Sequence, residues 1–85
     1  MQGNGDLVTA NKGTGISAAT GTGTYKDGAS VSLNATVSKG YTWKANESTT
    51  GWFDSNGKKV SSNQNYQFTM TPGAKTYTAK ATANI

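Results

Sequence analysis

Apolar and polar residues alternate in several short runs of this 85-residue chain. The clearest run spans residues 29–37, where Val31, Leu33 and Ala35 alternate with serine, asparagine and threonine. A period of two residues is typical of a strand with one buried face. No segment shows the period of about 3.6 residues that marks an amphipathic helix. The pattern therefore predicts an all-β protein.

Turn signals separate these runs at Asp27-Gly28, Asn56-Gly57 and Pro72-Gly73, where glycine supplies the positive φ of tight turns. The other predicted strands cover residues 8–10, 16–18, 41–45, 51–53, 58–60, 66–70 and 77–83. We expect the first two of these to form a hairpin through the glycine-rich residues 11–15. Another hairpin should join residues 51–53 to residues 58–60.

The expected fold class is a small antiparallel sandwich or grasp-like sheet of about seven or eight short strands, without substantial helix. Residues 21–25 should extend the second strand or bulge it. Residues 1–6 are assigned to an N-terminal linker and residues 7–85 to a single β-repeat domain. The predicted core residues are Val31, Leu33, Ala35, Tyr41, Trp43, Tyr66, Phe68 and Tyr77.

Composition removes most catalytic chemistry. The chain has no histidine and no cysteine, so Ser-His-Asp and Cys-His arrangements and thiolate metal sites are excluded. The four acidic residues all fall in predicted turns, loops or the terminus, where two of them would meet only by accident. No apolar run approaches the roughly 20 residues of a membrane helix. We therefore predict no enzyme activity, no cofactor, no metal site and no membrane insertion.

Three local motifs are better explained by turns or by ordinary solubilising charge than by ligands. Asp54-Ser55-Asn56-Gly57 lacks the downstream glutamate of a calcium loop. The Gly-Thr-Gly-Thr segment at residues 21–24 is followed by a predicted strand, so it lacks the helix N-terminus of a phosphate loop. Lys58-Lys59 is the one adjacent basic pair in a chain of net charge +4, and we predict no nucleic-acid binding.

An ordered series of motifs runs through most of the chain. It begins with Gly21-x-Gly23-x-Tyr25-x-x-Gly28 and Val31-x-Leu33-x-Ala35, continues with Gly40-Tyr41-x-Trp43 and Gly51-Trp52, and closes with Tyr66-x-Phe68-x-Met70. The series resembles the divergent internalin-type B-repeat of large bacterial and archaeal surface proteins. Residues 44–50 depart from that family as an insertion between the two aromatic segments, which should form a protruding loop.

The resemblance implies a non-catalytic structural spacer in a secreted or cell-surface protein of a bacterium or archaeon. Its partners would be neighbouring repeats of the same chain, and the isolated domain would be a monomer. The alternative is an adhesive module that binds a glycan or a host or matrix protein. A spacer should have dispersed polar faces and ends that point in opposite directions, whereas an adhesin should present one apolar or aromatic patch.

Trp52 and Phe53 are the candidate ligand-facing aromatics, because neighbouring strand residues point to opposite faces and cannot both enter one core. One ring is therefore expected to be exposed, or else packed between two sheets or against the inserted loop, and packing is the favoured reading. If the domain binds a ligand, this aromatic and the loop residues Lys44, Asn46 and Glu47 should form the edge of the site.

Overall fold

The computed structural model describes residues 5–84, which form ten strands and no helix. The strands are β1 (Asp6–Lys12), β2 (Ile16–Thr20), β3 (Gly23–Tyr25), β4 (Ser30–Val37), β5 (Tyr41–Thr42), β6 (Gly51–Phe53), β7 (Lys59–Ser61), β8 (Asn65–Thr69), β9 (Lys75–Lys80) and β10 (Thr82–Ala83). The all-β prediction is confirmed. The strands outnumber the expected seven or eight because two predicted runs are interrupted, one at residues 21–22 and one at Ala81.

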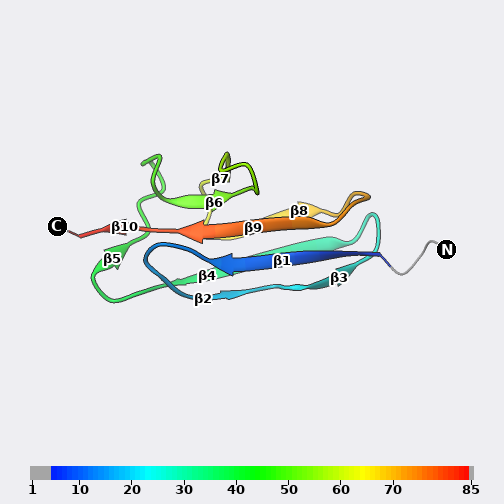
Figure 1. The fold of residues 1–85 in the computed structure, drawn as a ribbon, viewed down its shortest axis with the longest axis horizontal. Coiled ribbons are helices and arrows are strands. Elements are labelled where there is room, and N and C mark those ends of the chain that lie inside the picture. The colour runs from blue at the N-terminus through cyan, green and yellow to red at the C-terminus, as the bar shows by residue number, and fades with distance from the viewer. Residues whose placement is uncertain (1–4, 85) are drawn as a thin grey trace.

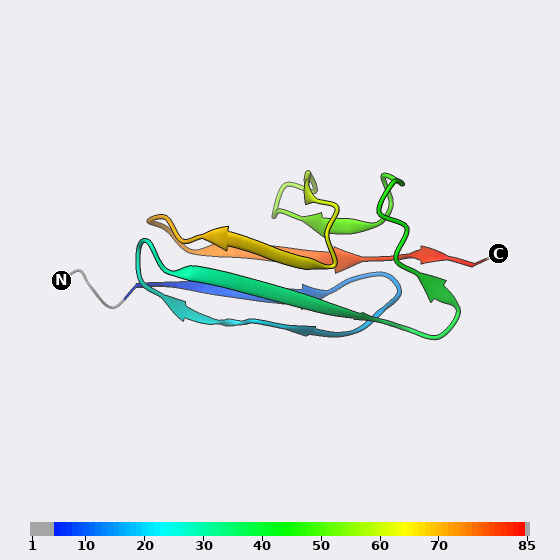
Figure 2. The ribbon, with the colours of Figure 1, turned by 180° about the vertical axis from the view of Figure 1, so that it is seen from behind.

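The strands form two main sheets that face each other. One sheet has the order β3-β1-β9-β6-β7, and the other has the order β2-β4-β8. Figure 1 shows β1 in front of β4 and β9 in front of β8, and Figure 2 shows the second sheet from its own side. A two-stranded ribbon of β5 and β10 extends one end of this sandwich.

Most strand pairs are antiparallel, but β1 and β9 are parallel neighbours in the larger sheet. These strands lie near the two ends of the sequence, and each has a second neighbour on its other side, β3 for β1 and β6 for β9. The chain therefore enters at one end of the sandwich and leaves at the other (Figure 1). The molecule measures 50 × 19 × 18 Å along its principal axes.

The strand β4 follows its predicted alternation. Val31, Leu33 and Ala35 are buried between the sheets, while the intervening serine, asparagine and threonine side chains are exposed. The Asp27-Gly28 turn precedes this strand as expected, and Gly28 has a φ of 87°. The predicted hairpin of β6 and β7 is also present, with Trp52 opposite Ser61 and an irregular register at the next residue.

The predicted first hairpin is wrong. β1 and β2 do not pair with each other, because β1 lies between β3 and β9 whereas β2 pairs with β4 in the other sheet. The intervening glycine-rich segment carries the chain across the sandwich instead of reversing it within one sheet. The Gly13 amide donates to the Ala79 carbonyl at 2.8 Å, so this segment is held by β9 rather than by β2.

The segment at residues 21–25 also changes sheet. β2 ends at Thr20 and β3 begins at Gly23, which pairs with Val8 of the opposite sheet. Gly21 lies at the corner with a φ of 115°. A Cβ atom at this position would lie 2.5 Å from the Ser32 carbonyl oxygen, so both its backbone angle and its close approach to β4 require glycine.

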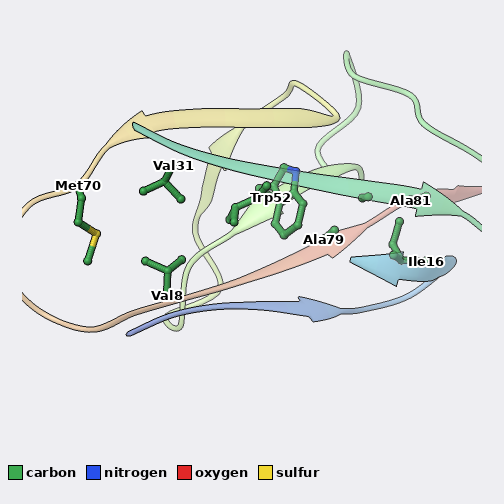
Figure 3. Packing of buried hydrophobic residues seen from close by; sticks show 9 residues of the cluster. Val8, Ile16, Val31, Trp52, Met70, Ala79 and Ala81 are labelled. Carbon is green, nitrogen blue, oxygen red and sulfur yellow. The ribbon is translucent and has the colours of Figure 1, made fainter. Parts of the chain in front are cut away.

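The core is centred on residues that the alternation only partly identified. Of the eight predicted core residues, Val31, Leu33 and Ala35 are buried, and the five aromatics are half-buried against them. The remaining members of the cluster are Val8, Ile16, Trp52, Met70, Ala79 and Ala81. Figure 3 shows the Trp52 ring between the two sheets, beside Ala79. The largest buried side chain was therefore missing from the predicted core.

Two boundaries differ from the sequence prediction. The strand expected over residues 41–45 ends at Thr42, and the chain then leaves the sheet to form the loop of residues 44–50. Asp6 was assigned to the N-terminal linker but is the first residue of β1, opposite Tyr25. Residues 1–4 of that linker, and Ile85, lie outside the described residues.

Candidate functional site

Trp52 cannot face a ligand, because its side chain is completely buried. The indole lies inside the sandwich (Figure 3), and its Nε1 atom donates to the Gln64 carbonyl oxygen at 3.0 Å. The buried donor thus has a partner within the protein. Trp52 is a core residue. The sequence did not identify it as one, because a strand of only three residues is too short for the alternation of apolar and polar residues to show which face is buried.

Phe53 points to the opposite face of the same strand and is nevertheless only 7% exposed. The Lys80 Nζ atom lies 4.9 Å from the centroid of the phenyl ring, in a cation–π contact. Ser48 and Thr49 of the loop border the small cavity of about 290 Å³ beside this ring. The favoured interpretation, in which both rings are packed, is therefore confirmed, since the core covers Trp52 and the inserted loop and Lys80 lie beside Phe53.

The inserted loop of residues 44–50 has a defined internal structure. The Lys44 carbonyl accepts the Glu47 amide at 2.9 Å, and the Glu47 carbonyl accepts the Thr50 amide at 3.2 Å. Thr50 is the buried polar residue that closes the loop, and its hydroxyl lies 2.6 Å from that of Thr82 in β10. These bonds fasten the loop to the C-terminal ribbon, while its tip protrudes above the sheet (Figure 1).

Lys59 of β7 fastens the other side of this loop. Its Nζ atom donates to the carbonyl oxygen of Ala45 at 3.2 Å and to that of Glu47 at 2.9 Å. The ammonium group therefore neutralises no carboxylate but binds the exposed backbone of the loop. A lysine read from sequence as ordinary turn charge has a structural role, and no sequence signal identified its two acceptors.

An open groove of about 620 Å³ runs between the loop and β7. Its lining consists of Ala45, Asn46, Glu47, Ser48, Lys59, Val60, Ser61 and Ser62. The structure thus places Asn46 and Glu47 at this groove and leaves Phe53 and Trp52 outside it. Lys44 is half-buried at the base of the loop, and its side chain is not part of this lining.

The chemistry available in the groove is hydrogen bonding. Glu47 is the one carboxylate in the lining, so a two-carboxylate hydrolytic mechanism has no second group there. Within residues 5–84, no group of three or more histidine, cysteine, aspartate or glutamate side chains could hold a metal ion. The groove offers amide, hydroxyl and backbone groups together with the charged Glu47 and Lys59 side chains, and its lining contains no aromatic residue.

The Asp54 side chain serves the turn in which it lies, by accepting hydrogen bonds from backbone amides of that turn. The carboxylate oxygen Oδ1 accepts the amides of Asn56 and Lys58, both at 2.9 Å. This arrangement is an Asx-type turn that stabilises the hairpin between β6 and β7. It agrees with the turn interpretation of the Asp-Ser-Asn-Gly motif.

Three half-buried aromatics form a second cluster, at the open side of the sandwich between β8 and β9. The Tyr66 and Phe68 ring centroids are 4.9 Å apart, and the Tyr77 ring lies 5.4 and 5.5 Å from them in edge-on contacts. Burial raises the pKa of Tyr66, and the neighbouring Tyr77 raises it further. The sequence predicted these rings as core but could not show that they lie at its margin.

The outer faces of the sheets are polar and sparsely charged. On the smaller sheet, the exposed side chains of β4 and β8 are serine, threonine, asparagine and glutamine. The Asn65 side-chain amide joins two of them, donating to Ser32 Oγ at 2.8 Å and to Asn34 Oδ1 at 2.9 Å. Among residues 5–84, Leu7 is the one exposed large hydrophobic residue, at 51%. A single leucine is far smaller than the apolar patch of an adhesive surface.

Within residues 5–84 there is no helix long and apolar enough to cross a membrane. Comparisons with known proteins add no further information about these features. No family model, no curated protein and no solved structure matches the chain.

Proposed function

We propose that this domain is a non-catalytic spacer module of a bacterial or archaeal cell-surface or secreted protein. The observation that carries the proposal is that the start of β1 and the end of β10 lie at opposite ends of a molecule 50 Å long (Figure 1). A module of this form adds its full length to a chain of repeats, because each copy begins where the previous one stops.

The surface supports the same proposal. The outer face of the smaller sheet holds uncharged polar side chains, and Leu7 is the one exposed large hydrophobic residue in the described part of the chain. Such a surface stays hydrated and gives neighbouring modules little reason to associate. Within residues 5–84 there is no broad exposed apolar patch of the kind that the adhesive alternative requires.

The glycines of the motif series are compatible with the proposed resemblance to the divergent B-repeat. Gly21, Gly28, Gly40 and Gly51 have positive φ values, whereas Gly23 does not. Four of the five motif glycines therefore lie where the backbone adopts an angle that favours glycine. The insertion of residues 44–50 is accommodated as a loop outside the two sheets.

Joined copies of the domain test the proposal. Proteins of one, two and three copies should increase in maximum dimension by about 50 Å per copy in small-angle X-ray scattering, the length of one module. Matched proteins with a flexible glycine-serine segment between copies provide the comparison for loosely linked modules. A three-copy protein no longer than the single domain would contradict the spacer function.

The adhesive alternative rests on the groove between residues 44–50 and β7. Its test is a titration with neutral glycans or mucin while backbone amide shifts are recorded. Binding should move the amides of Asn46, Glu47 and Ser62, with the outer face of β4 as the internal control. If those groove amides do not respond at any ligand concentration, the adhesive function is wrong for this groove.

A further inference from the structure

The first strand, β1, and the last long strand, β9, form a parallel ladder within the larger sheet. Five register pairs connect them, from Val8 opposite Lys75 to Lys12 opposite Ala79. Two more backbone hydrogen bonds continue the contact beyond the strands. The Gly13 amide donates to the Ala79 carbonyl and the Ala81 amide donates to the Thr14 carbonyl, both at 2.8 Å.

This ladder lies directly in the path of a force applied to the two ends of the domain. Because β1 and β9 are parallel, the first residue of β1 and the last residue of β9 lie at opposite ends of the ladder (Figure 1). Tension between them acts along the strands. The interstrand hydrogen bonds of a parallel pair are evenly spaced, so tension loads them together rather than one after another.

Neither strand can peel from an edge. In the order β3-β1-β9-β6-β7, both are interior strands, and each has an antiparallel neighbour on its far side. Separating β1 from β9 therefore requires the sheet to divide in its middle. The short strands β3 and β7 occupy the edges instead.

Packing also opposes sliding along the ladder. Val8 of β1 and Ala79 of β9 are completely buried against the smaller sheet. A slip of one residue would turn each inward side chain outward, because side chains alternate between faces with a period of two. The smallest slip that keeps apolar residues inside is thus two residues, and it breaks the ladder before new pairs can form.

Weaker contacts lie outside this ladder, between it and each end of the described chain. The Asp6 carboxylate accepts the Gly73 amide at 2.8 Å where the chain enters, and the Asn84 amide donates to the Gly40 carbonyl at 3.0 Å where it leaves. The ribbon of β5 and β10 adds only two register pairs. These contacts would yield first and leave the β1–β9 ladder to carry the load.

We propose that the β1–β9 pair is a mechanical clamp, so that the domain resists tension between its two ends. The inference rests on the proposed spacer function, since only a module joined at both ends experiences such a load. It adds that the spacer bears force as well as giving length.

Two pulling directions on the same protein test the clamp. The chain contains no cysteine, so one introduced cysteine gives a unique attachment point. Asn84→Cys and Ala74→Cys both replace exposed residues, one beyond the last strand and one just before β9. With a handle at the N-terminus, Asn84→Cys loads the ladder lengthwise, whereas Ala74→Cys pulls β1 and β9 apart from their common end.

The unfolding force measured with optical tweezers at one loading rate should be several-fold higher for Asn84→Cys than for Ala74→Cys. Urea denaturation of both variants, without load, checks that their stabilities are equal, because rupture force follows the unfolding barrier in the loaded direction. Equal forces, or a lower force for Asn84→Cys, would overturn the clamp.

Failure of the clamp is distinguishable from failure of the spacer. Equal forces combined with a scattering dimension that grows with copy number would leave the spacer in place and remove the clamp. A direction-dependent force in a domain whose joined copies fold back on one another would remove the spacer function, and with it the load that the clamp is proposed to bear.

Discussion

Trp52 is the residue on which the core depends most. It has the largest fully buried side chain in the described part of the chain, and it belongs to a buried cluster that includes residues of both sheets. Trp52→Ala should lower the free energy of unfolding by about 3 to 5 kcal/mol, because it leaves a cavity that the small neighbour Ala79 cannot fill. Urea denaturation measures this loss.

Leu7→Ala is the matched control, since it removes an exposed apolar side chain and should change stability by less than about 0.5 kcal/mol. If Trp52→Ala does not fold, Trp52→Phe keeps a ring but removes the donor to the Gln64 carbonyl. A Trp52→Phe protein as stable as the Leu7→Ala control would contradict a central role for Trp52.

Tyr66 makes the stability of the domain depend on alkaline pH. Burial, and then Tyr77, raise its pKa in the folded protein above the ordinary value of 10.0. Above that pH the unfolded chain releases the phenol proton while the folded chain retains it. The unfolded state is then favoured, so the free energy of unfolding should fall as pH rises through this range.

The comparison with Tyr66→Phe isolates this effect. Both proteins carry the same eight basic residues, so lysine titration contributes equally to each. Between pH 8 and about pH 11, the urea midpoint of the natural sequence should fall further than that of Tyr66→Phe. Parallel pH profiles for the two proteins would show that Tyr66 does not cause the loss.

At the scale of elements, the corner between β2 and β3 depends on Gly21. Its φ of 115° and the 2.5 Å approach of a built Cβ to the Ser32 oxygen predict that Gly21→Ala is strongly destabilising. We expect a loss of about 2 to 4 kcal/mol, from backbone strain of about 1 to 3 kcal/mol plus displacement of β4. Thermal denaturation measures it.

Gly23 supplies the control two residues away. A Cβ there would meet its nearest atom at 3.7 Å, and its φ is not positive. Gly23→Ala should change stability by less than about 1 kcal/mol, in either direction. Equal losses for the two variants would mean that the corner tolerates ordinary residues.

The inserted loop depends on Lys59. Lys59→Met keeps the apolar stem but removes the donor to the Ala45 and Glu47 carbonyls. Because the ammonium is partly exposed, the loss is on the order of 1 kcal/mol, or about fivefold faster amide exchange in the loop. Hydrogen exchange of the Glu47 and Thr50 amides measures it. Lys58→Met, at the exposed neighbouring position, should leave those rates unchanged.

The sequence predicted the elements better than their partners. The alternation of β4 and the Asp27-Gly28 turn were sufficient, because both depend on residues close in the chain. The pairing of β1 with β9 was not predictable, since the two strands are distant in sequence and glycine-rich loops suit a hairpin and a sheet crossing equally well. The sequence left the surroundings of Phe53 open for a related reason, because only the folded chain brings the inserted loop and Lys80 beside its ring.

For the whole molecule, the distance between the chain ends predicts how the domain can be permuted. A circular permutant that opens at the exposed turn of residues 55–57 must join the start of β1 to the end of β10, which lie at opposite ends of a molecule 50 Å long. An extended chain covers at most about 3.3 to 3.6 Å per residue, so the joining segment needs roughly 15 residues or more.

A permutant with a long glycine-serine segment of about 25 residues should fold as a monomer, whereas one with about four residues should unfold or exchange strands between molecules. Circular dichroism and size-exclusion chromatography distinguish these results. A stable monomer with the short segment would show that the ends lie much closer together than this structure places them.

The pairing of β1 with β9 also has a consequence for how the domain is made. Val8 of β1 is synthesised long before Lys75, its register partner in β9, so the larger sheet cannot form until Lys75 has been made. At synthesis rates of about 5 to 20 residues per second, that wait lasts several seconds, during which β1 lacks its central neighbour. In a chain of identical repeats, the β9 segment of an adjacent copy could take that place. Divergence of sequence between successive repeats would protect such an array from misassembly as it emerges from the ribosome.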